Sequence, residues 1–168
     1  MPTVCAVATE VAGDVVLTPL KGEAKSLEQW TTTFHLALVV LDPFTYESSW
    51  IIDTAVRIFR VFTEADCRVA FLITGDTDEA RQFIGPLAKE FLAFADPDRT
   101  AVEALGLETL PAFVHLNQLH QVDSKAEGWD PEAWRKVATQ LATVMSWRAP
   151  QIPVASDPVP FPGTPART

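Results

Sequence analysis

A chain of 168 residues is long enough for one domain of ordinary size, and 48% apolar residues are enough to fill its core. The formal net charge of −9 argues against nucleic acid or an anionic membrane surface as a partner, because lysine and arginine dominate binding to both. Apolar stretches stay well short of the roughly 18 residues that a membrane-spanning helix needs, so we expect no membrane insertion.

The compartment is indicated by the N-terminus and by the cysteines. The first ten residues, MPTVCAVATE, contain neither a basic region nor a long apolar run, so we expect no signal peptide. Two cysteines, Cys5 and Cys67, lie far apart in the sequence, which suits a reducing compartment where neither forms a disulfide. Together these features predict a cytoplasmic protein.

The N-terminal third leads into a buried strand and a helix. Residues 1–14 are weakly patterned and form an N-terminal segment, either an edge strand or nothing regular, and a short strand, a turn and a helical turn follow before residue 31. The run from Leu36 to Leu41 is apolar and rich in β-branched residues, which is typical of a strand buried on both faces. Asp42 and Pro43 end this strand, and from about Ser49 to Phe62 apolar residues recur at helical spacing.

Strands and helices then alternate along the chain. Strands are predicted over residues 67–74, 91–95 and 112–116, the last paired with 120–124 in a hairpin. Helices are predicted over residues 76–90, with a break or kink near Pro86, over 99–105, and from Asp130-Pro131 to about residue 147. This order predicts an α/β domain over residues 15–147 with parallel crossovers and a closing antiparallel hairpin.

The C-terminal segment, residues 148–168, has a different composition. It contains six of the thirteen prolines in the chain. Because proline cannot continue a helix or donate to a central strand, we expect an extended, mobile and disordered tail outside the fold.

Three short passages resemble one family. Thr109-Leu110-Pro111 before residues 112–114 (Ala-Phe-Val) resembles the cis-proline segment of thioredoxins, and residues 94–98 (Phe-Ala-Asp-Pro-Asp) with 104–106 resemble a passage of the redoxin and alkyl-hydroperoxide-reductase-like branch. Residues 20–27 resemble the lead-in of the same branch. The resemblance spans about residues 15 to 147 and implies a thioredoxin-like three-layer fold, with a mixed central sheet flanked by helices.

The resemblance fails where that family performs its chemistry. When residues 46–50 are placed on the Trp-Cys-x-x-Cys motif of thioredoxins, Glu47 and Trp50 take the two cysteine positions. When residues 44–48 are placed on the Phe-Thr-Phe-x-Cys motif of peroxiredoxins, Ser48 takes the place of the peroxidatic cysteine. Thiol–disulfide exchange needs a thiolate, so we predict no redox reaction here, no catalytic residue and no cofactor.

Other reactive side chains are interpreted as structural. His35, His115 and His120 have no cysteine or acidic partner in the predicted arrangement, so no metal site is predicted, although hairpin pairing could bring His115 and His120 together. Asp42 is interpreted as a structural acid at the end of the strand. The alternative is a proton carrier whose pKa is raised by burial. Cys67 is expected to be an inert, partly buried residue.

The former active-site loop and the cis-proline face are the predicted site. In proteins of this family these two features form a groove that binds extended protein segments. The candidate partner-binding residues are Phe44, Thr45, Tyr46, Glu47, Ser48, Trp50, Leu110 and Pro111. The aromatic rings are of the kind that anchor interfaces, and the alternative is that they pack under the loop and stabilise it.

Three functions therefore stay open at this point. The first is a redox-inactive thioredoxin-like protein that binds another protein, or serves as a scaffold, through this loop and face. The second is an atypical thiol oxidoreductase or peroxidase that uses Cys67 or Cys5. The third makes the Pro-rich tail the working part, with residues 159–162 as a polyproline II ligand rather than an unstructured end.

Overall fold

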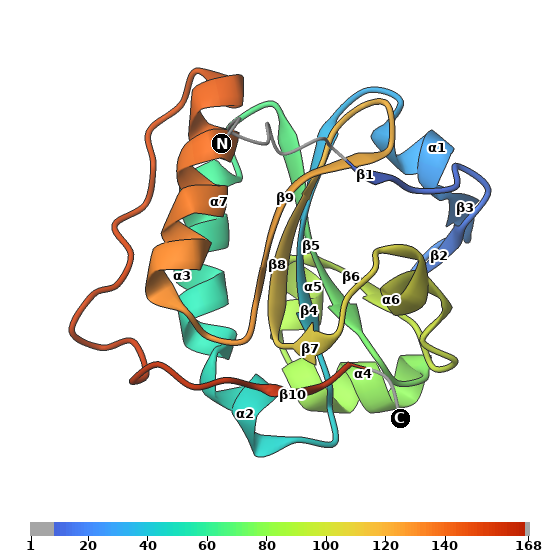
Figure 1. The fold of residues 1–168 in the computed structure, drawn as a ribbon. Helices are drawn as coiled ribbons and strands as arrows, with labels where there is room; N and C mark the ends of the chain where they lie inside the picture. Colours follow the sequence, from blue (N-terminus) through green and yellow to red (C-terminus); the bar gives the residue numbers. More distant parts are fainter. Residues whose placement is uncertain (1–8, 167–168) are drawn as a thin grey trace, which may run out of the picture.

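The structure is a computed structural model that describes residues 9–166. Its centre is an eight-stranded mixed sheet with the order β1-β9-β8-β4-β5-β6-β2-β3 (Figure 1). These strands are β1 (Thr9–Glu10), β2 (Val16–Pro19), β3 (Lys25–Ser26), β4 (His35–Leu41), β5 (Cys67–Ile73), β6 (Leu92–Ala95), β8 (Ala112–Leu116) and β9 (Gln121–Glu127). A separate two-stranded ladder joins β7 (Thr109–Leu110) to β10 (Thr164–Pro165).

Helices cover both faces of the sheet. They are α1 (Leu27–Thr31), α2 (Tyr46–Trp50), α3 (Ile52–Phe62), α4 (Thr77–Ile84), α5 (Leu87–Glu90), α6 (Thr100–Ala104) and α7 (Pro131–Met145). α3 and α7 lie on one side of the sheet, and α1 and α6 lie on the other (Figure 1). The buried side chains of α3, α4 and α7 form one core cluster with one face of the sheet, and those of α1 and α6 form a second cluster with the other face. The predicted three-layer α/β fold with a mixed central sheet is confirmed.

The predicted central strand is β4. Every side chain from Leu36 to Leu41 is inaccessible to solvent. β4 pairs with β5 in parallel along its whole length and with β8 in antiparallel. Its odd-numbered side chains pack toward α3 and α7 and its even-numbered ones toward α1 and α6, because successive residues of a strand point to opposite faces. An apolar run without alternation is what a strand with helices on both faces requires.

Two predicted helices are interrupted. The helix expected from Ser49 to Phe62 is divided into α2 and α3, which meet at Ile51. The break expected near Pro86 is confirmed, since α4 ends at Ile84 and α5 begins at Leu87. Gly85 lies between them with φ of 56°, a left-handed backbone conformation that glycine adopts without the Cβ clash of other residues.

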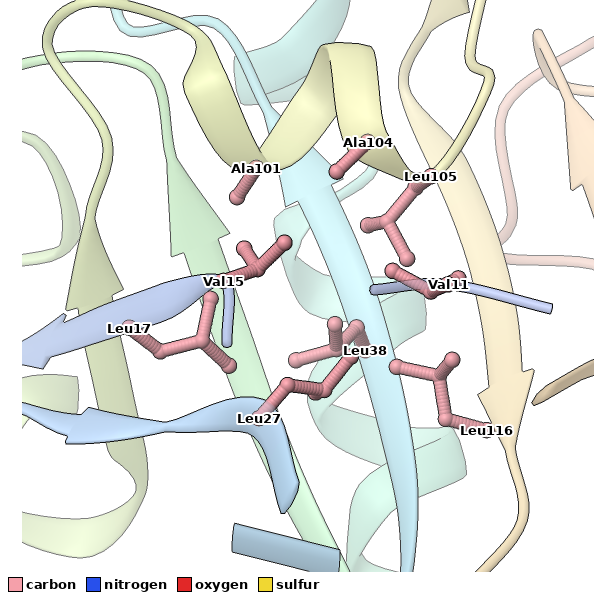
Figure 2. A pocket seen from close by; sticks show the side chains of 9 residues that line it. All are labelled: Val11, Val15, Leu17, Leu27, Leu38, Ala101, Ala104, Leu105 and Leu116. Atoms are coloured by element: carbon pink, nitrogen blue, oxygen red, sulfur yellow. The ribbon is translucent and has the colours of Figure 1, made fainter. Parts of the chain in front are cut away.

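A small cavity lies in the core cluster on the α6 side of the sheet. Figure 2 shows it between the α6 residues Ala101 and Ala104 and the strand residues Leu38 and Leu116. Its volume is about 10 Å³ and all of its lining side chains are apolar. A space of this size holds at most one water and offers that water no polar side chain, so it is not a ligand site.

The segment before the domain forms a short edge strand. β1 pairs with β9 in antiparallel, with Thr9 opposite Val122, which is one of the two outcomes expected for residues 1–14. Cys5 lies outside the described residues. In the described part of the chain, none of the helices is both long and apolar enough to cross a membrane.

The Pro-rich C-terminal segment is packed on the domain, so the expectation of a mobile tail outside the fold is wrong for residues 149–166. It passes along α7 and α3, then beside α2, and reaches β7 (Figure 1). Ile152 and Ala166 are buried in the two core clusters, and Asp157 accepts hydrogen bonds from Thr54 and Arg57 of α3. Proline excludes helix and central strand, but it does not prevent an extended segment from burying its apolar side chains.

Candidate functional site

The loop after β4 is organised around Asp42. The backbone N–H of Asp42 donates to Ser48 Oγ at 2.9 Å, and the N–H of Phe44 donates to Asp42 Oδ1 at 2.9 Å. Thr45 closes the turn, because its N–H and its hydroxyl both donate to the Asp42 carbonyl, at 3.3 and 3.2 Å. These bonds begin α2 at Tyr46 and fix the conformation of the loop.

Ser48 has a structural role. It is fully buried, and its hydroxyl oxygen accepts the N–H of Asp42, so the hydroxyl at the position compared with a peroxidatic cysteine stabilises the loop. Glu47 lies beside it in the first turn of α2 and is half-buried. Neither residue offers a thiol or an activated nucleophile in this loop.

Arg99 links this loop to the C-terminal segment, and sequence reasoning did not identify it. Its Nη2 lies 3.1 Å from Asp42 Oδ2, and both side chains are largely buried. Its Nη1 donates to the carbonyl of Ala166. The Asp42 carboxylate is therefore held by an arginine and a backbone N–H, which supports the strand-end role that we weighed against a proton carrier.

The three aromatic side chains of the loop are exposed. Phe44 is 66% exposed, Tyr46 81% and Trp50 53%. The ring of Trp50 meets that of Phe161 edge to face, with 5.5 Å between centroids, and Phe44 borders a hollow of about 210 Å³ together with Phe83 of α4. The alternative in which the rings pack under the loop does not fit these exposures.

The Leu110–Pro111 peptide bond is cis, as the resemblance implies. Leu110 is buried, and the edge of β7 pairs in antiparallel with β10, placing Thr164 opposite Leu110. The N–H of Ala166 donates to the carbonyl of Glu108 at 2.8 Å. The cis-proline face is thus covered by the C-terminal segment of the same chain.

Gly163 permits this close approach. Its φ is +86°, and a Cβ atom at this position would lie 2.5 Å from the carbonyl oxygen of Leu110.

The C-terminal segment connects the loop to the cis-proline face. Three features make this connection: the Trp50–Phe161 contact, the hydrogen bonds of Arg99 to Asp42 and Ala166, and the β7–β10 pairing.

Cys67 lies far from this loop. It is the first residue of β5 and pairs with His35 at the start of β4, whereas the loop follows the end of β4. Its thiol donates to the Phe62 carbonyl at 3.7 Å, and burial, followed by the charge of Asp66, raises the pKa of the thiol to about 11. Because the thiolate is the reactive form, Cys67 is a poor nucleophile at neutral pH.

The histidines are arranged differently from our expectation. His35 Nδ1 lies 2.8 Å from His115 Nε2, and Asp123 Oδ2 lies 3.9 Å from the same His115 nitrogen. His120 sits in the hairpin turn with φ of 47°, where its ring nitrogen Nδ1 lies 2.8 Å from the Val11 carbonyl oxygen. His115 thus has an acidic neighbour, contrary to prediction, and the partner that pairing brings to it is His35 rather than His120.

The proteins similar to this chain are found by comparison of structures and not by comparison of sequences. No protein-family model and no curated protein matches the sequence. A secreted disulfide oxidoreductase of Mycobacterium tuberculosis, homologous to DsbE of E. coli, has a TM-score of 0.58 at 15% identity and covers 77% of this chain and 96% of its own. The C48S mutant of peroxiredoxin Q from Xanthomonas campestris has a TM-score of 0.64 at 13% identity, covering 82% and 96%.

A third similar structure extends over the C-terminal segment. A hypothetical protein of Sinorhizobium meliloti has a TM-score of 0.65 at 15% identity and covers 96% of this chain and 94% of its own. At these identities the likeness concerns the arrangement of helices and strands. With the cis-proline segment before β8 and the helix-flanked mixed sheet, it shows that the chain has the thioredoxin-like fold.

Proposed function

We propose that this protein is a redox-inactive thioredoxin-like module that binds another protein through the 42–50 loop and the Leu110–Pro111 face. One observation is central: the edge of β7 binds an extended segment, β10, beside three exposed aromatic side chains. Addition of a strand to a sheet edge is a common mode of peptide recognition, in which the backbone supplies affinity and side chains supply specificity.

The chemistry of the loop supports the absence of thiol catalysis. Ser48 is buried and hydrogen-bonded to the backbone, and Cys67 lies at the opposite end of β4 with a raised thiol pKa. The alternative function, an atypical oxidoreductase, would have to use Cys67 in this setting or Cys5.

The intramolecular strand defines how a partner would bind. We propose that a partner segment replaces residues 161–166 on β7, while Tyr46 and Phe44 act as anchors at the rim. Tyr46 is the clearest anchor, since its ring is 81% exposed and its removal leaves the core intact. Aromatic residues of this kind account for much of the binding energy at protein interfaces.

The absence of redox activity is tested by turnover of insulin disulfides and of hydrogen peroxide. The wild-type protein and a Cys5→Ser/Cys67→Ser double variant are compared under the same conditions. We expect no turnover by either protein. Turnover by the wild type that disappears in the double variant would contradict the proposal and support the oxidoreductase alternative.

Partner binding is tested by crosslinking capture with matched variants. Tyr46→Ala removes an exposed ring in the loop, and Leu119→Ala removes a 68% exposed apolar side chain in the hairpin turn. We expect a partner captured by the wild type and by Leu119→Ala to be lost with Tyr46→Ala. Equal capture by both variants would place the interface elsewhere.

We also propose a cellular compartment for this protein. We place the protein in the cytoplasm, because the partly buried Cys67 is a free thiol, which suits a reducing environment. Cell fractionation of the untagged protein tests this assignment.

A further inference from the structure

Three polar side chains converge at the end of the sheet opposite the 42–50 loop. His35 is the first residue of β4, His115 lies in β8 and Asp123 in β9, which are adjacent strands in the sheet. The pairing of β8 with β9 is irregular here: His115 pairs with Ser124 and Leu116 with Val122, so Asp123 is left without a partner. Such a bulge redirects a side chain, and here Asp123 approaches His115.

The spacing of the three side chains fits one bound ion. One nitrogen of each histidine and one carboxylate oxygen all lie within 4.8 Å of one another. Ligand atoms at about 2.0–2.2 Å from a zinc-like ion are separated from each other by about 3 to 3.5 Å. The His35–His115 pair at 2.8 Å and the His115–Asp123 pair at 3.9 Å lie on either side of this range, and the His35–Asp123 pair lies within 4.8 Å. Side-chain rotations are therefore needed to bring all three atoms to ligand distance.

We propose that His35, His115 and Asp123 bind a divalent first-row transition-metal ion with three protein ligands. Two imidazoles and one carboxylate suit Zn²⁺, Co²⁺, Ni²⁺ or Fe²⁺ better than Mg²⁺ or Ca²⁺, which prefer oxygen ligands alone. This site lies at the other end of β4 from the proposed protein-binding loop, so either proposal can fail without the other.

The surroundings favour the ligating forms of these residues. Burial lowers the pKa of His115 to about 4, and burial also lowers that of His35 while the charge of Asp123 opposes the change. Asn117 Nδ2 donates to Asp123 Oδ1 at 2.7 Å and orients the carboxylate.

The buried His115 ring has one nitrogen, Nδ1, without a hydrogen-bond partner among the described residues. Its side chain is inaccessible to solvent. When Nε2 binds a metal, the proton moves to Nδ1, which metal sites commonly satisfy with a second-shell acceptor. Since that acceptor is absent from the described residues, we expect an affinity about 10–100-fold below that of a site with a complete second shell.

The site has an approach from solvent. Asp123 and Ser124 line an open hollow of about 470 Å³ between β9 and α7, together with Lys136 and Gln140. Three protein ligands leave a tetrahedral ion one position for water or a small ligand. An ion would therefore reach the site from this hollow, past the side chain of Asp123.

The test is metal binding by the full chain. Co²⁺ is titrated and its visible absorption recorded, and Zn²⁺ is then added in competition. We expect one Co²⁺ per chain, displaced by Zn²⁺, with binding weakened at least tenfold by Asp123→Asn and by His35→Gln. His115→Gln changes a fully buried residue, so these two variants provide the test if that protein does not fold.

The controls separate this site from other metal-binding side chains. His120→Gln changes the remaining histidine, and the Cys5→Ser/Cys67→Ser double variant removes both thiols; both should bind Co²⁺ as the wild type does. Absence of binding, or binding that Asp123→Asn and His35→Gln leave unchanged, would overturn the proposal.

Discussion

Ser48 and Ser49 are neighbours in α2 with different roles. Ser48 is buried and accepts the N–H of Asp42, whereas Ser49 is exposed and donates to the Tyr46 carbonyl. Ser48→Ala leaves a buried N–H without an acceptor, so we expect a loss of about 1–3 kcal/mol in the free energy of unfolding. Ser49→Ala should stay within about 0.5 kcal/mol, as surface changes usually do. Urea denaturation of the two variants measures the difference, and equal losses would show that Ser48 does not hold the loop.

Cys67 should react slowly. Its thiol pKa of about 11 lies two units above the ordinary value of 9.0, which reduces the thiolate fraction roughly a hundredfold at neutral pH. In a Cys5→Ser background, we expect alkylation by iodoacetamide to be slow at pH 7.5, to accelerate as the pH approaches 11, and to become fast in denaturant. Mass spectrometry of timed samples follows the reaction. Fast alkylation of the folded protein at pH 7.5 would revive the oxidoreductase alternative.

Residues of the loop could be predicted only where local sequence determines them. The strand-end position of Asp42 follows from the apolar run before it and Pro43 after it. Its partner Arg99 could not be predicted, because it lies 57 residues away and adopts a left-handed conformation with φ of 58°. A contact of this kind depends on the turn before α6 and on the position of that helix over the sheet.

At the level of elements, strands with strong patterns were predictable and their register was not. The apolar runs of β4, β5 and β8 gave their positions within about one residue. The His35–His115–Asp123 cluster depends instead on the antiparallel register of β4 with β8 and on the irregular pairing of β8 with β9. A shift of one residue moves every side chain to the other face, so sequence pattern alone could not bring these three together.

The β7–β10 ladder depends on Gly163. In Gly163→Ala, the new Cβ would lie 2.5 Å from the Leu110 oxygen, in a left-handed conformation that alanine tolerates poorly. Gly85→Ala is the matched control, since Gly85 also has positive φ but nothing lies within 4 Å of its added Cβ. We expect the positive φ alone to cost about 1–3 kcal/mol in both variants, and we expect faster amide exchange of Ala166 only in Gly163→Ala.

The same pair of variants tests competition at the cis-proline face. If a partner strand replaces residues 161–166 on β7, Gly163→Ala should bind that partner more tightly than the wild type, while Gly85→Ala should not. Weaker capture by Gly163→Ala would instead make the bound C-terminal segment part of the interface. Titration calorimetry with a synthetic peptide of residues 158–168 provides a defined probe of the exposed edge.

On the scale of the whole molecule, the C-terminal segment joins elements that are distant in the sequence. It contacts α3 through Asp157 and the connection between β9 and α7 through the pairing of Phe161 with Trp129. Its Ala166 carbonyl binds Arg99, which in turn holds Asp42 of the 42–50 loop. Composition could not predict this, because prolines report only which regular structures a segment cannot form. Between the prolines lie apolar residues, and Ile152 among them is buried. Its buried position is formed by residues that are distant in the sequence, so local composition does not reveal it.

Asp157 is the polar anchor of this segment, and its contribution should depend on pH. Its side chain is 3% exposed and lies 2.6 Å from Arg57 Nη2. Burial opposes its charge, but hydrogen bonds from the Val154 N–H, Arg57 and Thr54 outweigh this and lower its pKa below the ordinary 3.8. A carboxylate with a lowered folded-state pKa stabilises the protein fully above about pH 5 and loses this effect as the pH falls through the folded-state value.

We therefore expect Asp157→Asn to reduce the free energy of unfolding by about 1–3 kcal/mol at pH 7, because the buried network loses its negative charge and one of its two acceptor oxygens. The difference from wild type should be constant down to about pH 5 and should shrink below pH 4, where the wild-type carboxyl becomes protonated. Asp14→Asn, a change at an exposed aspartate, is the control. Denaturation curves between pH 3 and pH 7 measure the effect, and a difference that persists unchanged to pH 3 would mean that packing of the segment, rather than the charge of Asp157, holds it on α3.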